Sequence, residues 1–142
     1  MAEPAFTAGS FYAYLREGRL MAARCSRCGG LHLPPRPLCN RCQSLEMAWV
    51  ELQGKGKLAA YTAIAVAPGF MAAQGYGKDK PYCTGIVELE EGPRISAWIA
   101  GVDAAHPEGI AIGMAVRILF SGGPQGPDDQ QGAAMPVLTF TA

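Results

Sequence analysis

Apolar and polar positions follow two different periods along this chain, and the first of them lies near the N-terminus. Between residues 10 and 16, the apolar side chains of Phe11, Tyr14 and Leu15 have the i, i+3, i+4 spacing of an amphipathic helix, and Gly18 supplies a stop. An isolated helix of about ten residues is marginal in water. We therefore expect its aromatic face to pack on this chain or on another protein.

From residue 47 onward the alternation has the period of two that is typical of strands. Strands are expected over residues 47–52, 57–66, 82–89, 95–101, 114–120 and 137–140. The turns between them are rich in glycine and proline. About six short strands favour a small closed barrel of the OB type, because a β-sandwich usually has about seven strands.

Two loops are long for so small a barrel, and long loops in compact domains usually have a function or are disordered. Residues 121–135 have the composition of a flexible linker. Residues 67–80 place aromatic and basic side chains among glycines, which is typical of a contact surface. The candidate contact residues of this loop are Phe70, Tyr76, Lys78 and Lys80.

Charge and composition exclude several classes of partner. Twelve basic and twelve acidic residues among 142 leave no formal net charge, so the field that steers nucleic acid or an anionic membrane is missing. The sequence has no apolar run near the roughly 20 residues of a membrane span and no signal-peptide pattern. We expect a cytoplasmic protein that binds neither nucleic acid nor membrane.

Four of the five cysteines form two Cys-x-x-Cys pairs, Cys25 with Cys28 and Cys39 with Cys42. Two such pairs separated by ten residues can place four thiolates tetrahedrally around one Zn²⁺. A four-thiolate site has no open position, so the predicted zinc is structural. Iron in a rubredoxin-like site and four free cysteines are the alternatives, and both are less favoured by the spacing.

This cysteine pattern completes the predicted fold, which is mostly β. A short helix and a rubredoxin-like zinc ribbon are expected over residues 1–46, followed by an OB-type barrel over residues 47–142. Arg27 and Arg41, one in each cysteine pair, can offset the negative charge of the thiolates. His32 is a substitute ligand only if one of the four cysteines is not used.

Few residues outside the ribbon offer catalytic chemistry. Cys83 lies in a strand pattern with Val87 and Leu89, where a cysteine usually acts as a small buried hydrophobe and not as a nucleophile. His106 is the only other histidine and therefore the only imidazole base for it beyond the ribbon. We predict no catalytic residue in this chain.

The order of these motifs resembles a known family, the zinc-ribbon OB-fold proteins associated with acyl-CoA metabolism, over nearly the whole chain. The matching segments are 11–20, 34–39, 54–56, 81–82, 88–94 and 112–114. The loop over residues 67–80 is longer and richer in glycine than the family pattern, so contacts there are not transferred residue by residue.

The resemblance implies a small non-catalytic accessory subunit of a thiolase-type enzyme. Such a subunit docks on a thiolase-fold partner and shapes its acyl-CoA channel, so a CoA thioester is a ligand of the complex. The partner's reaction would be CoA-dependent thiolysis of a 3-oxoacyl-CoA, with aromatic substrates such as benzoylsuccinyl-CoA included. Phe11, Tyr12 and Tyr14 of the helix are the expected partner contacts, and the loop with Phe70 is a second surface for the partner or for acyl-CoA.

Two alternatives from other classes remain at this point. An OB-fold protein that binds nucleic acid would show a basic stripe interleaved with aromatic side chains. A free-standing acyl-CoA enzyme would use Cys83 as its nucleophile, with a base within reach.

Overall fold

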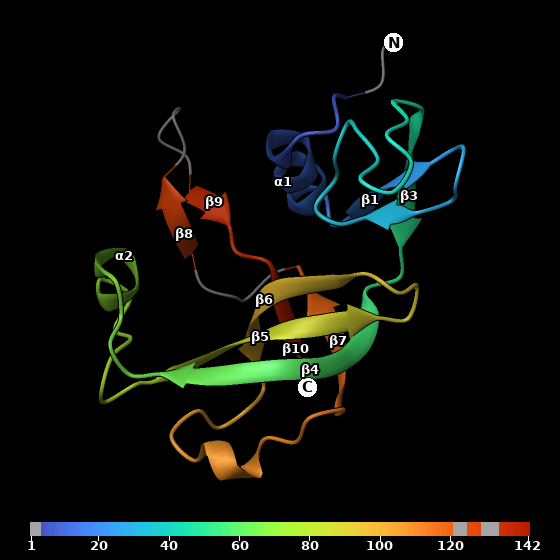
Figure 1. Cartoon of the computed structure of the whole chain (residues 1–142). Helices are drawn as coiled ribbons and strands as arrows, with labels where there is room; N and C mark the ends of the chain where they lie inside the picture. The colour runs from blue at the N-terminus through green and yellow to red at the C-terminus, as the bar shows by residue number, and fades with distance from the viewer. Residues whose placement is uncertain (1–3, 121–124, 129–133) are drawn as a thin grey trace.

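The computed structural model describes residues 4–120, 125–128 and 134–142 (Figure 1). In chain order, its helices and strands are α1 (Ala8–Arg16), β1 (Leu20–Cys25), β2 (Leu31–His32), β3 (Met47–Leu52), β4 (Lys55–Ile64), α2 (Gly69–Ala72), β5 (Tyr82–Leu89), β6 (Arg94–Ala100), a 3-10 turn (Pro107–Gly109), β7 (Ala115–Leu119), β8 (Gln125–Asp128), β9 (Ala134–Pro136) and β10 (Thr139–Thr141). No helix in the described ranges is long and apolar enough to cross a membrane. The mostly β fold expected from the sequence is confirmed.

Helix α1 forms where the apolar spacing predicts it and begins two residues earlier. Thr7 caps its N-terminus by accepting a hydrogen bond from the Ser10 amide at 3.2 Å. The chain leaves the helix at Gly18, whose φ of 78° lies in the left-handed region that glycine tolerates best. Phe11 and Leu15 are the buried face of the helix.

The ribbon sheet has three antiparallel strands in the order β2-β1-β3. Strand β1 was not expected, because its residues Leu20 to Ala23 are all buried and show no alternation. The strand expected over residues 47–52 is present as β3, but it pairs with β1 from Leu20↔Leu52 to Cys25↔Met47. Strand β3 therefore belongs to the ribbon sheet. The expectation that residues 47–52 form part of the barrel was wrong.

Five strands form a closed barrel in the order β10-β6-β5-β4-β7, which confirms the OB-like barrel. Strand β10 closes it by pairing in parallel with β6 and antiparallel with β7. Strand β4 carries a bulge between Leu58 and Ala60. Next to the bulge, Gly85 pairs with Tyr61, and glycine is required there because a Cβ would collide with the carbonyl oxygen of Ala60.

The segment expected as a flexible linker lies partly outside the described residues. Its described parts are not a linker, because β8 and β9 pair antiparallel in a separate two-stranded sheet. The backbone of β9 lies close to α1, and that of β8 close to α2. Backbone pairing of this kind does not require alternating apolar residues. The composition of the segment therefore gave no sign of the two strands.

One core joins the helix, the ribbon and the barrel. In Figure 1, α1 and the ribbon lie together beside the barrel. The shared core combines Phe11 of α1, Leu20 and Leu52 of the ribbon, and Leu58 and Phe140 of the barrel. All five are buried, so the ribbon packs on the barrel through its own apolar side chains.

Candidate metal centre and neighbouring surfaces

The first zinc knuckle, residues 25–30, is a tight turn held by backbone hydrogen bonds. The amide of Cys25 donates to the Gly30 carbonyl at 2.9 Å, and the amide of Gly29 donates to the Cys25 carbonyl at 2.8 Å. Gly29 has a φ of 77°, and a Cβ added there would meet no atom within 4 Å. Glycine is therefore required here by backbone conformation and not by crowding.

The second knuckle, residues 39–44, repeats this geometry. The amide of Cys39 donates to the Ser44 carbonyl at 2.9 Å, and the amide of Gln43 donates to the Cys39 carbonyl at 2.9 Å. Gln43 is the position equivalent to Gly29 and has a φ of 60°, the one positive value of a non-glycine residue in the described chain. The matched turns present their two cysteine pairs to each other.

The four sulfur atoms of Cys25, Cys28, Cys39 and Cys42 all lie within 4.8 Å of one another. In two of the pairs, Cys25 with Cys42 and Cys28 with Cys39, the Sγ atoms are 3.5 Å apart. Zinc bound tetrahedrally at about 2.3 Å requires sulfur atoms about 3.8 Å apart. The donor set and its spacing therefore fit a closed structural zinc site, with no position for a substrate.

Hydrogen bonds around the sulfurs shift the pKa values of the thiols in both directions. The Cys28 amide is the largest influence on the Cys25 thiol and helps to lower its pKa to about 6. At Cys42 the Ser44 amide lowers the pKa, but the hydrogen bond with Cys25 and burial together raise it to about 11. The amide of Arg41 also donates to Cys39 Sγ at 3.4 Å. Zinc displaces the remaining protons when it binds, because its ligands are thiolates.

His32 is buried beside the ribbon but is not part of the sulfur cluster. Its side chain is 7% exposed, and its Nε2 atom has no hydrogen-bond partner among the described residues. Burial, with Arg36 and Arg41 as positive neighbours, lowers its pKa. Four cysteines already complete the set of ligand atoms, so the alternative of a histidine ligand is not needed.

Cys83 lies inside the barrel, where substrate cannot reach it. Its side chain is 1% exposed, in β5 between Ala63 of β4 and Ile99 of β6. Burial raises the pKa of its thiol, which opposes formation of the nucleophilic thiolate. His106 lies in an exposed loop, where its Nδ1 is 2.8 Å from Asp103 Oδ2. This geometry favours the reading of Cys83 as a packing residue.

The aromatic side chains of α1 are covered by this chain more fully than their spacing suggested. Phe11 is 3% exposed and lies in the shared core. On the other face, Tyr14 packs edge to face on Trp49, with ring centroids 5.1 Å apart, and Trp49 stacks on Phe6 at 4.7 Å. Phe11 therefore offers little exposed surface outside the core. A partner contact through Phe11, Tyr12 or Tyr14 stays a prediction.

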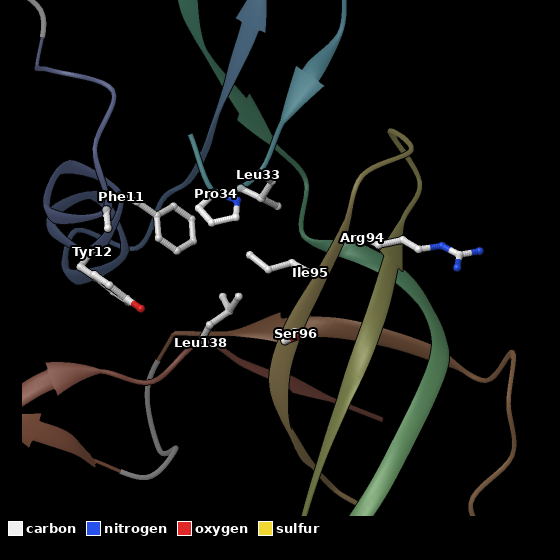
Figure 2. Close-up of a pocket in the computed structure, with 9 residues that line it drawn as sticks. Phe11, Tyr12, Leu33, Pro34, Arg94, Ile95, Ser96 and Leu138 are labelled. Atoms are coloured by element: carbon white, nitrogen blue, oxygen red, sulfur yellow. The ribbon is translucent and has the colours of Figure 1, made fainter. Parts of the chain in front are cut away.

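A groove of about 410 Å³ lies between α1, the segment after β2, β6 and the segment before β10 (Figure 2). It is lined by Ala8, Phe11, Tyr12, Leu33, Pro34, Arg94, Ile95, Ser96 and Leu138. Figure 2 shows the guanidinium of Arg94 pointing away from the apolar side chains, and its Nη2 contacts Glu88 at 3.3 Å. The interior of the groove is therefore mainly apolar. Sequence reasoning missed it.

The predicted contact loop packs partly on the barrel. Tyr76 lies edge to face on Tyr82 and Trp98, at 5.6 and 5.0 Å between ring centroids, and Lys80 Nζ is 4.4 Å from the centre of the Tyr76 ring. Phe70 is 42% exposed, and Lys78 and Lys80 are also exposed.

Tyr82 and Trp98 stack on each other at 4.5 Å and are both buried. These two barrel aromatics are therefore not free to stack on bases, as the nucleic-acid alternative would require.

Comparisons with known proteins agree with this geometry. Residues 13–48 match the family model described as ChsH2, rubredoxin-like zinc ribbon domain, and residues 49–121 match the model for the ChsH2 C-terminal OB-fold domain. A DUF35 domain-containing scaffold protein from Methanocaldococcus jannaschii is 39% identical over 102 residues, which cover 71% of this chain and 67% of that protein. A protein of the same description from Pyrococcus furiosus is 34% identical over 110 residues, or 77% of this chain and 74% of the relative.

A probable enoyl-CoA hydratase alpha subunit from Thermomonospora curvata is 35% identical over 101 residues, which are 71% of this chain and only 29% of that protein. Among solved structures, the Ltp2-ChsH2(DUF35) aldolase matches with a TM-score of 0.69 and 26% identity, and the match covers 98% of both chains. A DUF35 protein from Sulfolobus solfataricus has the same fold, with a TM-score of 0.60, 16% identity and coverage of 94% and 83%. The chain thus belongs to the DUF35 family of ChsH2-like proteins, which join a zinc ribbon to an OB-fold barrel.

Proposed function

We propose that this chain is a non-catalytic accessory subunit of a thiolase-fold acyl-CoA enzyme. The observation that carries the proposal is the match over 98% of the chain to a ChsH2(DUF35) protein whose structure is named together with a second protein, Ltp2, as an aldolase. A relative named as an enoyl-CoA hydratase subunit also points to acyl-CoA chemistry. We place the complex in the cytoplasm.

The chemistry of this chain suits a supporting role. Its zinc site is closed by four sulfur ligands, and Cys83 is buried with a raised pKa. The partner would therefore supply the nucleophile and the acid-base groups. For the partner we propose CoA-dependent thiolysis of a 3-oxoacyl-CoA. The partner's nucleophile takes the acyl group as the bond between C2 and C3 breaks, C2 gains a proton and leaves as the shortened CoA thioester, and a second CoA thiol then receives the acyl group and gives up its proton. Aromatic acyl-CoAs such as benzoylsuccinyl-CoA are included in this class.

The groove gives this chain a means of shaping the acyl-CoA channel. Its volume of about 410 Å³ lies within the range of ligand pockets, about 300 to 1,000 Å³. Apolar side chains such as Leu33, Ile95 and Leu138 line it. Since the cation of Arg94 points away, the groove suits the apolar part of a bound thioester or of the partner better than the phosphates of CoA.

Co-expression tests the proposal directly. The tagged chain is produced with the thiolase-fold protein whose gene lies nearest in the same genome, and the complex is isolated by affinity and size-exclusion chromatography. Thiolysis of acetoacetyl-CoA and of an aromatic 3-oxoacyl-CoA is then measured for each protein alone and for the complex.

We expect a stable complex, no activity for this chain alone, and higher kcat/KM for the complex than for the partner alone. If the chain elutes alone while the partner is fully active without it, the proposal is wrong. If the isolated chain catalyses thiolysis and Cys83→Ala abolishes that activity, the chain is a free-standing acyl-CoA enzyme and not an accessory subunit.

A further inference from the structure

The second zinc knuckle presents apolar side chains to solvent beside the metal site. Leu38 is 46% exposed and Leu45 is 74% exposed. They flank the hydrogen-bonded pair of Cys39 and Ser44, whose amide and carbonyl are 2.9 Å apart, so both leucines lie at the base of the same turn. Large apolar side chains at adjacent exposed positions commonly mark an interaction surface.

Two arginines lie close to these leucines along the chain. Arg41 is at the tip of the same knuckle, and Arg36 precedes Leu38 by two residues. Both carry positive charge near His32, where they add to the effect of burial in lowering its pKa. Neither guanidinium forms an ion pair with a described residue, in contrast to Arg19, whose Nε lies 3.1 Å from Glu51. We name the set Leu38, Leu45, Arg36 and Arg41 the second-knuckle face.

The charge around this face is positive on balance. Residues 24–46 contain four arginines, no lysine and one acidic residue, Glu46. Zinc with four thiolates carries about two negative charges, which Arg27 and Arg41 are placed to offset as equivalents in the two knuckles. Arg36 lies outside both knuckles and is exposed. Arginine is suited to interfaces, because its planar guanidinium can bind a carboxylate through two hydrogen bonds.

We propose that the second-knuckle face binds the partner enzyme, at a surface that has an apolar centre and acidic side chains around it. Leu38 and Leu45 fill the centre of the contact, and Arg36 pairs with a carboxylate at its edge. The inference rests on the proposed function and gives it a location. It replaces Phe11 as the main anchor, because Phe11 is already buried in the core of this chain.

The test compares two sets of surface variants in binding to the same thiolase-fold protein. The first set is the double variant Leu38→Ser, Leu45→Ser and the single variant Arg36→Glu. The controls make the same chemical changes on the barrel side of the chain, where Ile112 is 60% exposed and Arg117 is exposed on β7: Ile112→Ser and Arg117→Glu. Zinc content of every variant is measured by elemental analysis, and Kd by calorimetry at about 0.05 and 0.5 M salt.

We expect Kd to rise about tenfold or more for each variant of the first set and less than about twofold for the controls. Wild-type binding should weaken with salt, and Arg36→Glu should reduce that dependence. Wild-type affinity in both the zinc-loaded double variant and Arg36→Glu would overturn this inference and leave the accessory-subunit proposal standing. Salt-independent wild-type binding would also overturn it, because the partner surface would not be acidic.

Two further outcomes have defined meanings. If the double variant loses zinc, its Kd does not test the interface, and the Kd of Arg36→Glu becomes the deciding measurement. An unchanged Kd for Arg36→Glu then overturns the inference. If wild type binds no thiolase-fold protein, the proposed function fails and this inference fails with it.

Discussion

Removal of zinc should destabilise the barrel as well as the ribbon, because both share one core. Without the ion, four sulfurs confined within 4.8 Å lose the bonds that hold the two knuckles together. Structural zinc contributes about 10 to 16 kcal/mol of apparent binding free energy, which is comparable with the whole stability of a small domain, about 5 to 15 kcal/mol. We therefore expect residues 20–52 to unfold when zinc is chelated or when Cys39 is replaced by alanine.

The effect on the barrel follows from the ribbon side chains that enter its core. Leu20, Leu33 and Leu52 are all at least nine-tenths buried and belong to the shared cluster. Each contributes about 1.5 to 3 kcal/mol by burial, although relaxation of the barrel recovers part of this. We therefore expect the barrel to lose about 4 kcal/mol of its free energy of unfolding. A loss of this size lowers amide protection roughly a thousandfold.

Hydrogen exchange with and without a chelator measures both effects in one experiment. Protection should vanish over the ribbon and should fall by about a thousandfold at barrel positions such as Leu58 and Val87. Zinc release is followed in parallel with a chromogenic chelator. Barrel protection that is unchanged after complete zinc loss would contradict this prediction, because it would show that the ribbon and the barrel are energetically independent despite their shared core.

Three further predictions concern single residues. Cys83→Ala should leave the activity of the reconstituted complex within about threefold, since a buried strand cysteine contributes packing; a loss of orders of magnitude with zinc and partner binding intact would contradict this. Gly29→Ala should lower the free energy of unfolding by about 1 kcal/mol. There is room for the added Cβ, but a backbone φ of 77° is unfavourable for alanine. The control Gly9→Ala, in helix α1, should not destabilise the protein.

The hydrogen bond to Asp103 raises the pKa of His106 above its ordinary value of 6.5. The stabilisation from the charged pair is therefore fully present below pH 6.5 and is lost as the pH rises through the raised pKa of His106. An NMR titration should show this elevation in the wild type and its disappearance in Asp103→Asn. Equal values in the two proteins would refute the pairing.

The parts of the structure that could be predicted are those whose signal is local in sequence. The metal site needed only the spacing of four cysteines, since each knuckle is a short turn closed by its own backbone. Strand β5 matches its expected bounds, Tyr82–Leu89, because one face is buried and the residues alternate. The expected strands at 57–66 and 114–120 were found with their ends shifted by one or two residues.

What could not be predicted depends on contacts between distant segments. Strand β1 is covered on both faces and so lacks alternation. The assignment of β3 to the ribbon is decided by pairing with β1, which leaves no mark in the sequence of β3. The groove takes Ala8, Leu33, Ile95 and Leu138 from four separate regions. Likewise, aromatic spacing in α1 gave no sign that Trp49 covers Tyr14.

The positions of the two tryptophans give the protein a built-in pair of optical reporters. Trp49 lies in the ribbon, half-buried between Phe6 and Tyr14, with its indole nitrogen donating to the Pro4 carbonyl at 3.0 Å. Trp98 lies in the barrel and is 8% exposed. Because the chain contains only these two, a Trp→Phe change at either position leaves a fluorophore that reports on one half alone. Emission spectra of the two variants can therefore follow the order in which the halves assemble as metal is added to the unfolded chain.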